Sequence, residues 1–230
     1  GFELLDRTGL LKLLLPEIDA MKGVEQSPEY HPEGDVFIHT MLTLAHLDSP
    51  TETLAYGCLL HDVGKPVCIR RDEARLTFYG HTEKGAAMAE EVLKRLKRSR
   101  TTRERVAYLV RNHLRHLQAP QMRLSTLKRF LGEDGIDELL ELTRIDALSA
   151  NGDLQHYRFC IEKLAELKTE EIHPEPLLRG RDLIAMGFSP GPNFHEILKQ
   201  VEEAQLGGEL SSREQAMAWV EKNYGGEVKK

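Results

Sequence analysis

The chain has 230 residues, of which 40% are hydrophobic and 30% are charged, and its formal net charge is −6. This composition is typical of a globular protein, and the length suits one domain with an appendage or two small domains. The acidic balance excludes a protein that binds nucleic acid over its whole surface, so any RNA contact requires a local basic patch. No apolar run approaches the ~20 residues of a membrane helix. Three cysteines without a C-x-x-C pair predict a cytoplasmic protein.

Apolar residues recur at helical spacing along most of the chain, which predicts an all-α fold. Asp35 and Thr51 stand where helix-capping residues are expected, just before two of the apolar segments. Two short apolar stretches, 67–70 and 76–79, predict either a small hairpin or a loop. The predicted helices cover residues 4–15, 36–47, 53–61, 86–96, 104–117, 136–150, 155–167, 194–206 and 213–224.

A change in composition near residue 170 predicts a domain boundary. Residues 168–176 are charged and contain prolines, which favours an extended linker. We therefore expect an N-terminal helical segment (1–25), a central helical domain (26–170) and a small C-terminal helical tail (171–230). The chain starts at Gly1 within a helical pattern, so we interpret it as a piece of a longer protein.

A histidine and an aspartate, His61 and Asp62, stand side by side where an apolar helix is predicted to end, in the segment GCLLHDVGKP (57–66). His39 and Asp146 lie on two other apolar helices, where an acid is costly to bury unless it is paired or binds a metal. Together the four side chains offer two imidazoles and two carboxylates. This mixed set suits a six-coordinate divalent ion such as Mn, Ni, Co, Fe or Mg better than a structural zinc.

The order of these residues resembles the HD-domain superfamily of metal-dependent phosphohydrolases. The resemblance implies a helical bundle whose metal ligands are His39, His61, Asp62 and Asp146. Two further histidines match the family pattern: His81 in the segment GHTEKGA and His113 in the segment VRNHL. In HD phosphodiesterases such histidines can hold a second metal ion or contact the phosphate, so the resemblance implies one ion with places for a second.

A more extensive resemblance is to the C-terminal half of bacterial tRNA nucleotidyltransferases, the CCA-adding enzymes and their poly(A) polymerase relatives. It covers nearly the whole chain, from about Leu4 to Trp219. No Gly-rich motif of the type GGxVRD occurs, so the resemblance implies the HD half without the nucleotidyltransferase head. The matching segments are LLLPEI (13–18), HPEGDVFIH (31–39), LRGRDLIAMGFSPGP (178–192) and QLGG (205–208).

From this resemblance we expect a metal-dependent phosphodiesterase or phosphatase that acts on nucleotide or RNA-end phosphates, for example a 2′,3′-cyclic phosphate. Asp62 is expected to bridge two metals or to orient water. Lys65 is expected to face the phosphate, with Gly64 allowing the backbone to turn close to it. His81 and His113 are expected to stabilise developing charge or to protonate the leaving oxygen.

Other interpretations stay open at this point. The metal site can simply brace the fold, Lys65 can simply cap a helix C-terminus, and the chain can be a non-catalytic module that binds tRNA for a separate head or a domain that senses nucleotides. The basic run Lys94–Arg105 fits either an RNA backbone contact or a solvated surface.

His46, seven residues after His39, is a rival ligand. The remaining histidines are expected at the surface or at helix caps: His31, His116, His156, His173 and His195.

Overall fold

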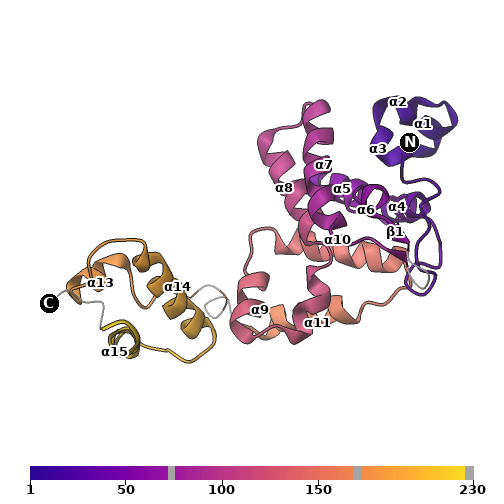
Figure 1. Cartoon of the computed structure of the whole chain (residues 1–230). Coiled ribbons are helices and arrows are strands. Elements are labelled where there is room, and N and C mark those ends of the chain that lie inside the picture. Colours follow the sequence, from indigo (N-terminus) through magenta and orange to yellow (C-terminus); the bar gives the residue numbers. More distant parts are fainter. Residues whose placement is uncertain (72–75, 168–171, 173, 226–230) are drawn as a thin grey trace. The chain divides into compact units, whose positions relative to one another are not determined.

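The computed structural model describes residues 1–71, 76–167, 172 and 174–225, and it confirms the predicted all-α class (Figure 1). Among these residues, no helix is both long and apolar enough to cross a membrane. The two strands are β1 (Arg70–Arg71) and β2 (Leu76–Thr77). The helices are α1 (Phe2–Arg7), α2 (Leu10–Leu14), α3 (Pro16–Asp19), α4 (Val36–Ala45), α5 (Glu52–Leu60), α6 (Lys65–Cys68), α7 (His81–Arg95), α8 (Arg100–Asn112), the 3-10 helix η1 (Arg115–Gln121), α9 (Leu124–Leu131), α10 (Ile136–Ser149), α11 (Gln155–Glu166), α13 (Gly180–Ala185), α14 (Asn193–Leu206) and α15 (Arg213–Tyr224).

The chain divides into two compact units that do not follow one another in the sequence. Residues 1–118 and 137–160 form the first unit, and residues 119–136 and 161–230 form the second. Helix α9 therefore belongs with the tail helices although it lies between two segments of the first unit. The division into 1–25, 26–170 and 171–230 stays a prediction, and most of the expected linker at 168–176 lies outside the described residues.

Helix α5 lies at the centre of the first unit, packed against α4 and α8. Its approach to its neighbours is close at Gly57, where a Cβ atom would lie 3.0 Å from a methyl group of Leu109 on α8 and 3.7 Å from one of Leu142 on α10. Side chains of α2, α3, α4, α5, α7 and α8 share one apolar core. Burial of this core supplies most of the driving force for folding the unit and fixes the helix ends that carry the site.

The predicted helix starts at Asp35 and Thr51 are confirmed, because the Asp35 carboxylate accepts the Ile38 N–H and the Thr51 hydroxyl accepts the Leu54 N–H. The predicted helix at 4–15 is wrong as a single element. Gly9, with φ +73°, separates α1 from α2.

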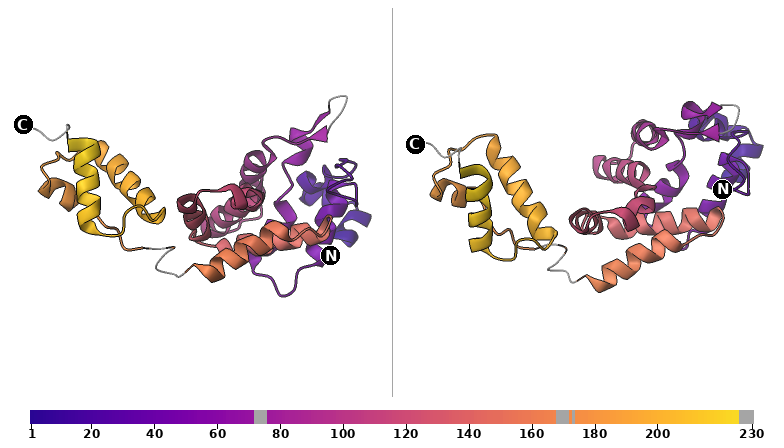
Figure 2. Two further views of the ribbon diagram at one scale, coloured as in Figure 1. Left: turned by 90° about the horizontal axis from the view of Figure 1, so that it is seen from below. Right: turned by 60° about the horizontal axis from the view of Figure 1, so that its bottom comes forward.

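The hairpin prediction holds for only part of its residues. β1 and β2 pair antiparallel and stand out from the helices in Figure 2. The first half of the stretch 67–70, however, belongs to α6, which has Pro66 in its first turn, where the fixed φ of proline favours a helix start.

The second unit has its own apolar core, formed around α13, α14 and α15 (Figure 1). Asp182 ties two of its helices together, because its carboxylate accepts the Arg179 N–H at the start of α13 and pairs with Arg213 on α15 at 2.6 Å. Helix α9 packs against α14. The core residues of this unit are Leu178, Leu183, Phe188, Ile197, Val201, Ala204, Leu210, Ala216 and Val220.

Two glycines allow α6 and α7 to meet at the sequence HDVGKP. A Cβ atom at Gly64 would lie 2.2 Å from the carbonyl oxygen of His81 and 2.7 Å from the amide nitrogen of Gly85. Gly64 has an ordinary φ of −80°, so its lack of a side chain matters for space rather than for backbone conformation. Gly64 thus has a packing role, which places His81 beside Asp62, and its expected role near a phosphate stays a prediction.

We predict that Gly64→Ala destabilises the protein by about 2 kcal/mol or more, because the new methyl group meets backbone atoms that cannot move aside. Urea unfolding followed by circular dichroism measures the change. Gly225→Ala is the control, since nothing lies within 4 Å of a Cβ there and the expected change is within about 0.5 kcal/mol. Equal stability of the Gly64→Ala variant and the wild type would contradict this account of the contact.

Candidate metal centre

The residues from His61 to Lys65, here called the HD turn, follow directly after α5. His61 is the C-cap of α5, and its N–H donates to the carbonyl of Gly57 at 2.8 Å. Leu60 and Val63 on either side are fully buried and anchor the turn in the core. The HD turn therefore holds Asp62, which is 1% exposed, inside the protein rather than at its surface.

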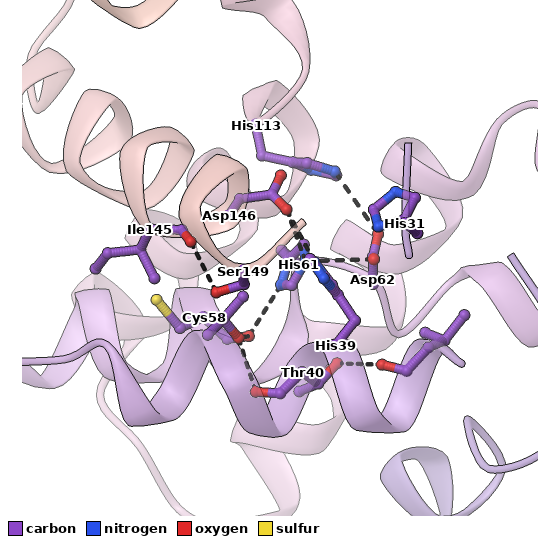
Figure 3. A network of polar contacts seen from close by, with 12 residues as sticks. His31, His39, Thr40, Cys58, His61, Asp62, His113, Ile145, Asp146 and Ser149 are labelled. Carbon is purple, nitrogen blue, oxygen red and sulfur yellow. Dashed lines mark hydrogen bonds and ion pairs between the residues drawn. The ribbon is translucent and has the colours of Figure 1, made fainter. Parts of the chain in front are cut away.

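Side chains from three separate elements meet at one side of the HD turn (Figure 3). His39 projects from α4, and its Nε2 lies 2.9 Å from Oδ1 of Asp146 on α10. The same carboxylate oxygen lies 3.8 Å from Nε2 of His61. His61 Nε2 is also 3.3 Å from Oδ2 of Asp62. The structure thus brings together all four side chains that the sequence predicts as metal ligands.

The other oxygen of Asp62 faces a second pair of histidines. Oδ1 lies 3.6 Å from Nε2 of His81, the first residue of α7, and 3.8 Å from Nε2 of His113, the C-cap of α8. Asp62 therefore lies between two groups of possible ligands, one with His39 and His61 and one with His81 and His113. The role of Asp62 as a carboxylate that bridges two ions stays a prediction.

Backbone carbonyls fix the orientation of most of these rings. The Nδ1 atoms of His61, His81 and His113 lie 2.9, 2.9 and 2.8 Å from the carbonyl oxygens of Cys58, Phe78 and Val110. A carbonyl oxygen can only accept, so each Nδ1 carries a proton, and in this tautomer of a neutral ring the lone pair of Nε2 faces Asp62. Hydrogen bonds of this kind orient histidines that bind metals.

A cation fits this arrangement because the buried acceptors lack donors. Among the described residues, Nε2 of His61, Nε2 of His81 and both carboxylate oxygens of Asp62 are buried without a hydrogen-bond partner. Lone pairs that face one another in a water-poor interior are unfavourable unless a proton or a metal ion lies between them. The set combines imidazole nitrogen with carboxylate oxygen, as divalent first-row metals and related hard ions prefer.

Electrostatics keeps the two carboxylates ionised. Burial favours the neutral acid at Asp62, but the charge of Lys65 and the neighbouring His61 outweigh it and hold the pKa of Asp62 well below its usual value. Burial also favours the neutral acid at Asp146, but the hydrogen bond with His39 outweighs burial, so the pKa of Asp146 is lowered. Both carboxylates therefore carry the charge that a metal ligand needs.

The histidines divide into two electrostatic classes. Burial lowers the pKa of His39, but the contacts with Asp146 and Glu33 outweigh this effect and raise the pKa to about 10. At His113, burial and the neighbouring His61 lower the pKa to about 3. Burial also lowers the pKa of His81. His81 and His113 are thus neutral near pH 7 and are poor proton donors in this state.

Lys65 is buried in the HD turn beside the carboxylate. Its Nζ lies 2.6 Å from Oδ2 of Asp62, as an ion pair whose angles are not those of a hydrogen bond. It donates a hydrogen bond to Oε1 of Gln26 at 2.5 Å and lies 5.5 Å from the centre of the Phe78 ring. Lys65 is the first residue of the four-residue α6 and follows the C-cap of α5 by four positions, so its role as a charge at a helix C-terminus stays a prediction.

The remaining histidines differ from expectation in two cases. His31 contacts Glu33 and stands edge-on to His39 at 4.8 Å between ring centres, so it is not a simple surface residue. His116 is buried, with its Nδ1 against the carbonyl oxygen of His113. His46, the rival ligand, is exposed at the end of α4, while His195 is exposed as predicted and His173 lies outside the described residues.

Two polar residues near the site are missing from the predicted set. Gln26 supports Lys65, and Glu33 lies against His39. Glu33 carries a weak sequence signal, because it is an acid inside the segment HPEGDVFIH that precedes an apolar helix. Gln26 carries none, since a glutamine in a loop is usually solvated.

The basic run Lys94–Arg105 forms the end of α7, a short connection and the start of α8. Its side chains lie largely at the surface, and several are paired with acids. The pairs are Arg95 with Glu17, Arg98 with Glu52, and Arg100 with Glu104, at 2.7 to 2.9 Å. This pairing reduces the positive potential that the run can offer to RNA.

Comparisons with known proteins agree with this geometry. Residues 35–151 match the model of the HD domain family. The chain is 33% identical to an A-adding tRNA nucleotidyltransferase of Deinococcus radiodurans, over 96% of this chain and 54% of that protein. It is 33% identical to a CC-adding tRNA nucleotidyltransferase of Thermus thermophilus, over 96% of this chain and 52% of that protein.

A multifunctional CCA protein of Halorhodospira halophila is 38% identical over 59% of this chain and 32% of its own length. The chain spans about half the length of the first two relatives. The family match begins at Asp35, the N-cap of α4, and ends two residues after α10, so it includes every helix that carries a predicted metal ligand. The chain therefore belongs to the HD domain family and is related to the tRNA nucleotidyltransferases.

Proposed function

We propose that this chain is a metal-dependent phosphohydrolase that acts on nucleotide or RNA-end phosphates. The observation that carries the proposal is the set of buried nitrogen and oxygen lone pairs around Asp62 that lack donors. A purely structural histidine cluster would satisfy these atoms within the protein. Membership of the HD domain family, whose members are in general metal-dependent hydrolases, supports the same interpretation.

His39, His61, Asp62 and Asp146 are the residues that would hold the ion, and His81 and His113 would hold a second one with Asp62. When bound, a divalent ion acidifies water and polarises a phosphoryl oxygen. The protein's own contribution is to hold these side chains in place, with Asp62 and Asp146 already ionised and His81 and His113 already neutral. His39, whose pKa is raised to about 10, would have to give up its Nε2 proton when the ion binds.

The other site residues have narrower roles than the sequence suggests. Lys65 keeps Asp62 ionised and shields its charge, since its ammonium group is already engaged by Asp62 and Gln26. His81 and His113 keep their protons on Nδ1, against carbonyl oxygens, so their Nε2 atoms accept rather than donate. We infer that they act as ligands or as acceptors from water, and that the proton for the leaving oxygen comes from solvent.

The substrate class is inferred from the relatives. Proteins named as tRNA nucleotidyltransferases act on RNA ends, and this chain is similar to two of them over 96% of its length. A 2′,3′-cyclic phosphate or a 2′-phosphate at an RNA end is the phosphate ester that we propose to test first.

A second candidate function is a non-catalytic module that supports tRNA binding by a nucleotidyltransferase head. The similarity to tRNA nucleotidyltransferases over most of the chain favours it. The acid partners of Arg95, Arg98 and Arg100 weaken the contribution of the basic run to such binding.

We predict that the purified chain binds Co²⁺ or Mn²⁺ and that His39→Ala weakens the binding by at least about tenfold, because a nitrogen ligand is lost. Isothermal titration calorimetry measures the affinity. His46→Ala is the matched control, since His46 follows the same helix but is exposed, and it should bind the ion as the wild type does. Equal affinity of the two variants would exclude His39 from the site.

We predict that Asp62→Ala abolishes metal-dependent hydrolysis, lowering kcat at least about a thousandfold for nucleoside 2′,3′-cyclic phosphates and for p-nitrophenyl phosphate esters. The reason is that Asp62 contacts both ligand groups. Removal of metal by EDTA should abolish the activity of the wild type, and added Mn²⁺ should restore it.

A wild-type chain that binds metal and tRNA but hydrolyses none of these esters would favour the module over the hydrolase. Activity that survives in Asp62→Ala would remove Asp62 from the reaction.

A further inference from the structure

One histidine of the metal centre differs from the others in the partner of its Nδ1 atom. His61, His81 and His113 lie at helix ends, and each uses a backbone carbonyl three residues earlier. His39 lies inside α4, where the carbonyls one turn earlier are engaged. The oxygen of Asp35 accepts the His39 N–H, and that of Val36 accepts the Thr40 hydroxyl.

The group that lies against His39 Nδ1 is the carboxylate of Glu33. Its Oε1 atom is 2.7 Å from His39 Nδ1 and 2.9 Å from Nδ1 of His31. The Glu33 side chain is only 6% exposed, and its second oxygen has no hydrogen-bond partner among the described residues. The contact with His39 is a close ion pair whose angle is not that of an aligned hydrogen bond, so a small rotation of either group would be needed to align it.

The loop of residues 23–35, here called the support loop, places Glu33 at this point. Asp35 closes the loop, because its carboxylate accepts the Ile38 N–H at 2.9 Å and the Gly23 N–H at 2.7 Å. Gly34, with φ +78°, donates to the carbonyl of His31 and accepts from the Gln26 N–H. The same loop thereby supplies both Glu33 beside His39 and Gln26 beside Lys65.

We propose that Glu33 is a positioning residue for the metal centre, acting through His39. The inference rests on the proposed metal site. A metal ion that takes the Nε2 lone pair of His39 leaves the single ring proton on Nδ1, and the acceptor within reach there is the Glu33 carboxylate. A carboxylate behind a ligating histidine fixes the ring and makes the nitrogen a stronger ligand than a carbonyl partner does. His39 is then the strongest imidazole ligand of the set. Because the support loop holds Glu33 in place, the affinity of His39 for the ion depends on the conformation of this loop.

The cluster of His31, Glu33 and His39 has a competing interpretation as a separate metal site, because its ligand atoms lie within 4.8 Å of one another. It would require His39 to bind two ions through its two nitrogens at once. The proximity of Asp146 to Nε2 commits His39 to the centre at Asp62, and this favours the positioning role.

Co²⁺ titration of the full chain, followed by visible absorption, tests the proposal. Glu33→Gln keeps an acceptor but removes the charge, and we expect about tenfold weaker binding; Glu33→Ala should weaken it about 100-fold. Glu29→Gln, an exposed acid in the same loop, should leave the affinity unchanged. His31→Ala should leave both the stoichiometry and the affinity within about twofold of the wild type.

The outcomes separate the inference from the proposed function. A wild-type chain that binds no Co²⁺ refutes the metal centre itself. Wild-type affinity in Glu33→Gln and Glu33→Ala, with a change only in urea unfolding of the metal-free protein, would show that Glu33 merely stabilises the fold and overturns the positioning role. Loss of one equivalent of Co²⁺ in His31→Ala would overturn it in favour of a separate site.

Discussion

The buried charge of Asp62 is the constraint on which the first unit depends. A carboxylate in the interior costs several kcal/mol unless it is paired, and Lys65 faces only one of its two oxygens. The other oxygen faces the Nε2 atoms of His81 and His113, which carry no proton while their Nδ1 atoms donate to carbonyls. Acceptors that converge in this way repel one another, so the fold stores an unfavourable arrangement that a cation relieves.

Helix ends solve the geometric part of this problem. His61 and His113 are C-caps and His81 opens its helix, so a backbone carbonyl lies within reach of each Nδ1. The close contact between Gly64 and α7 brings the end of α5, with His61, near the start of α7, with His81. The chemistry of the site is therefore set by where helices stop as much as by which side chains they carry.

The sequence is enough to identify charged side chains that would be costly to bury, because they interrupt an otherwise apolar helical pattern. An acid inside an apolar helix, as at Asp146, and the His61–Asp62 pair stand out without a structure. The sequence indicates His81 and His113 only through family resemblance, because a single histidine on a helix is usually structural. Glu33 and Gln26 could not be placed, since their positions depend on the loop turn at Gly34 rather than on periodicity.

The helical periodicity of the sequence predicts the fold class, but it does not predict the short helices and strands. The stretch from Val67 to Arg70 has strand-forming residues, yet its first half is helical because Pro66 fixes the first turn and the HD turn sets the direction of the chain. Tertiary packing here overrides a local preference that amounts to at most about 1 kcal/mol. The grouping of α9 with the tail also depends on tertiary packing, and no local sequence pattern predicts it.

That grouping has a consequence for how the chain can be divided. Residues 119–136 leave the first unit and residue 137 returns to it, so the polypeptide passes from one unit to the other three times. A cut at the proline-containing stretch near 170 would detach α14 while leaving α9, which packs against it, behind. The two units are therefore joined by three chain connections, and separating them requires removing an internal segment rather than shortening one end.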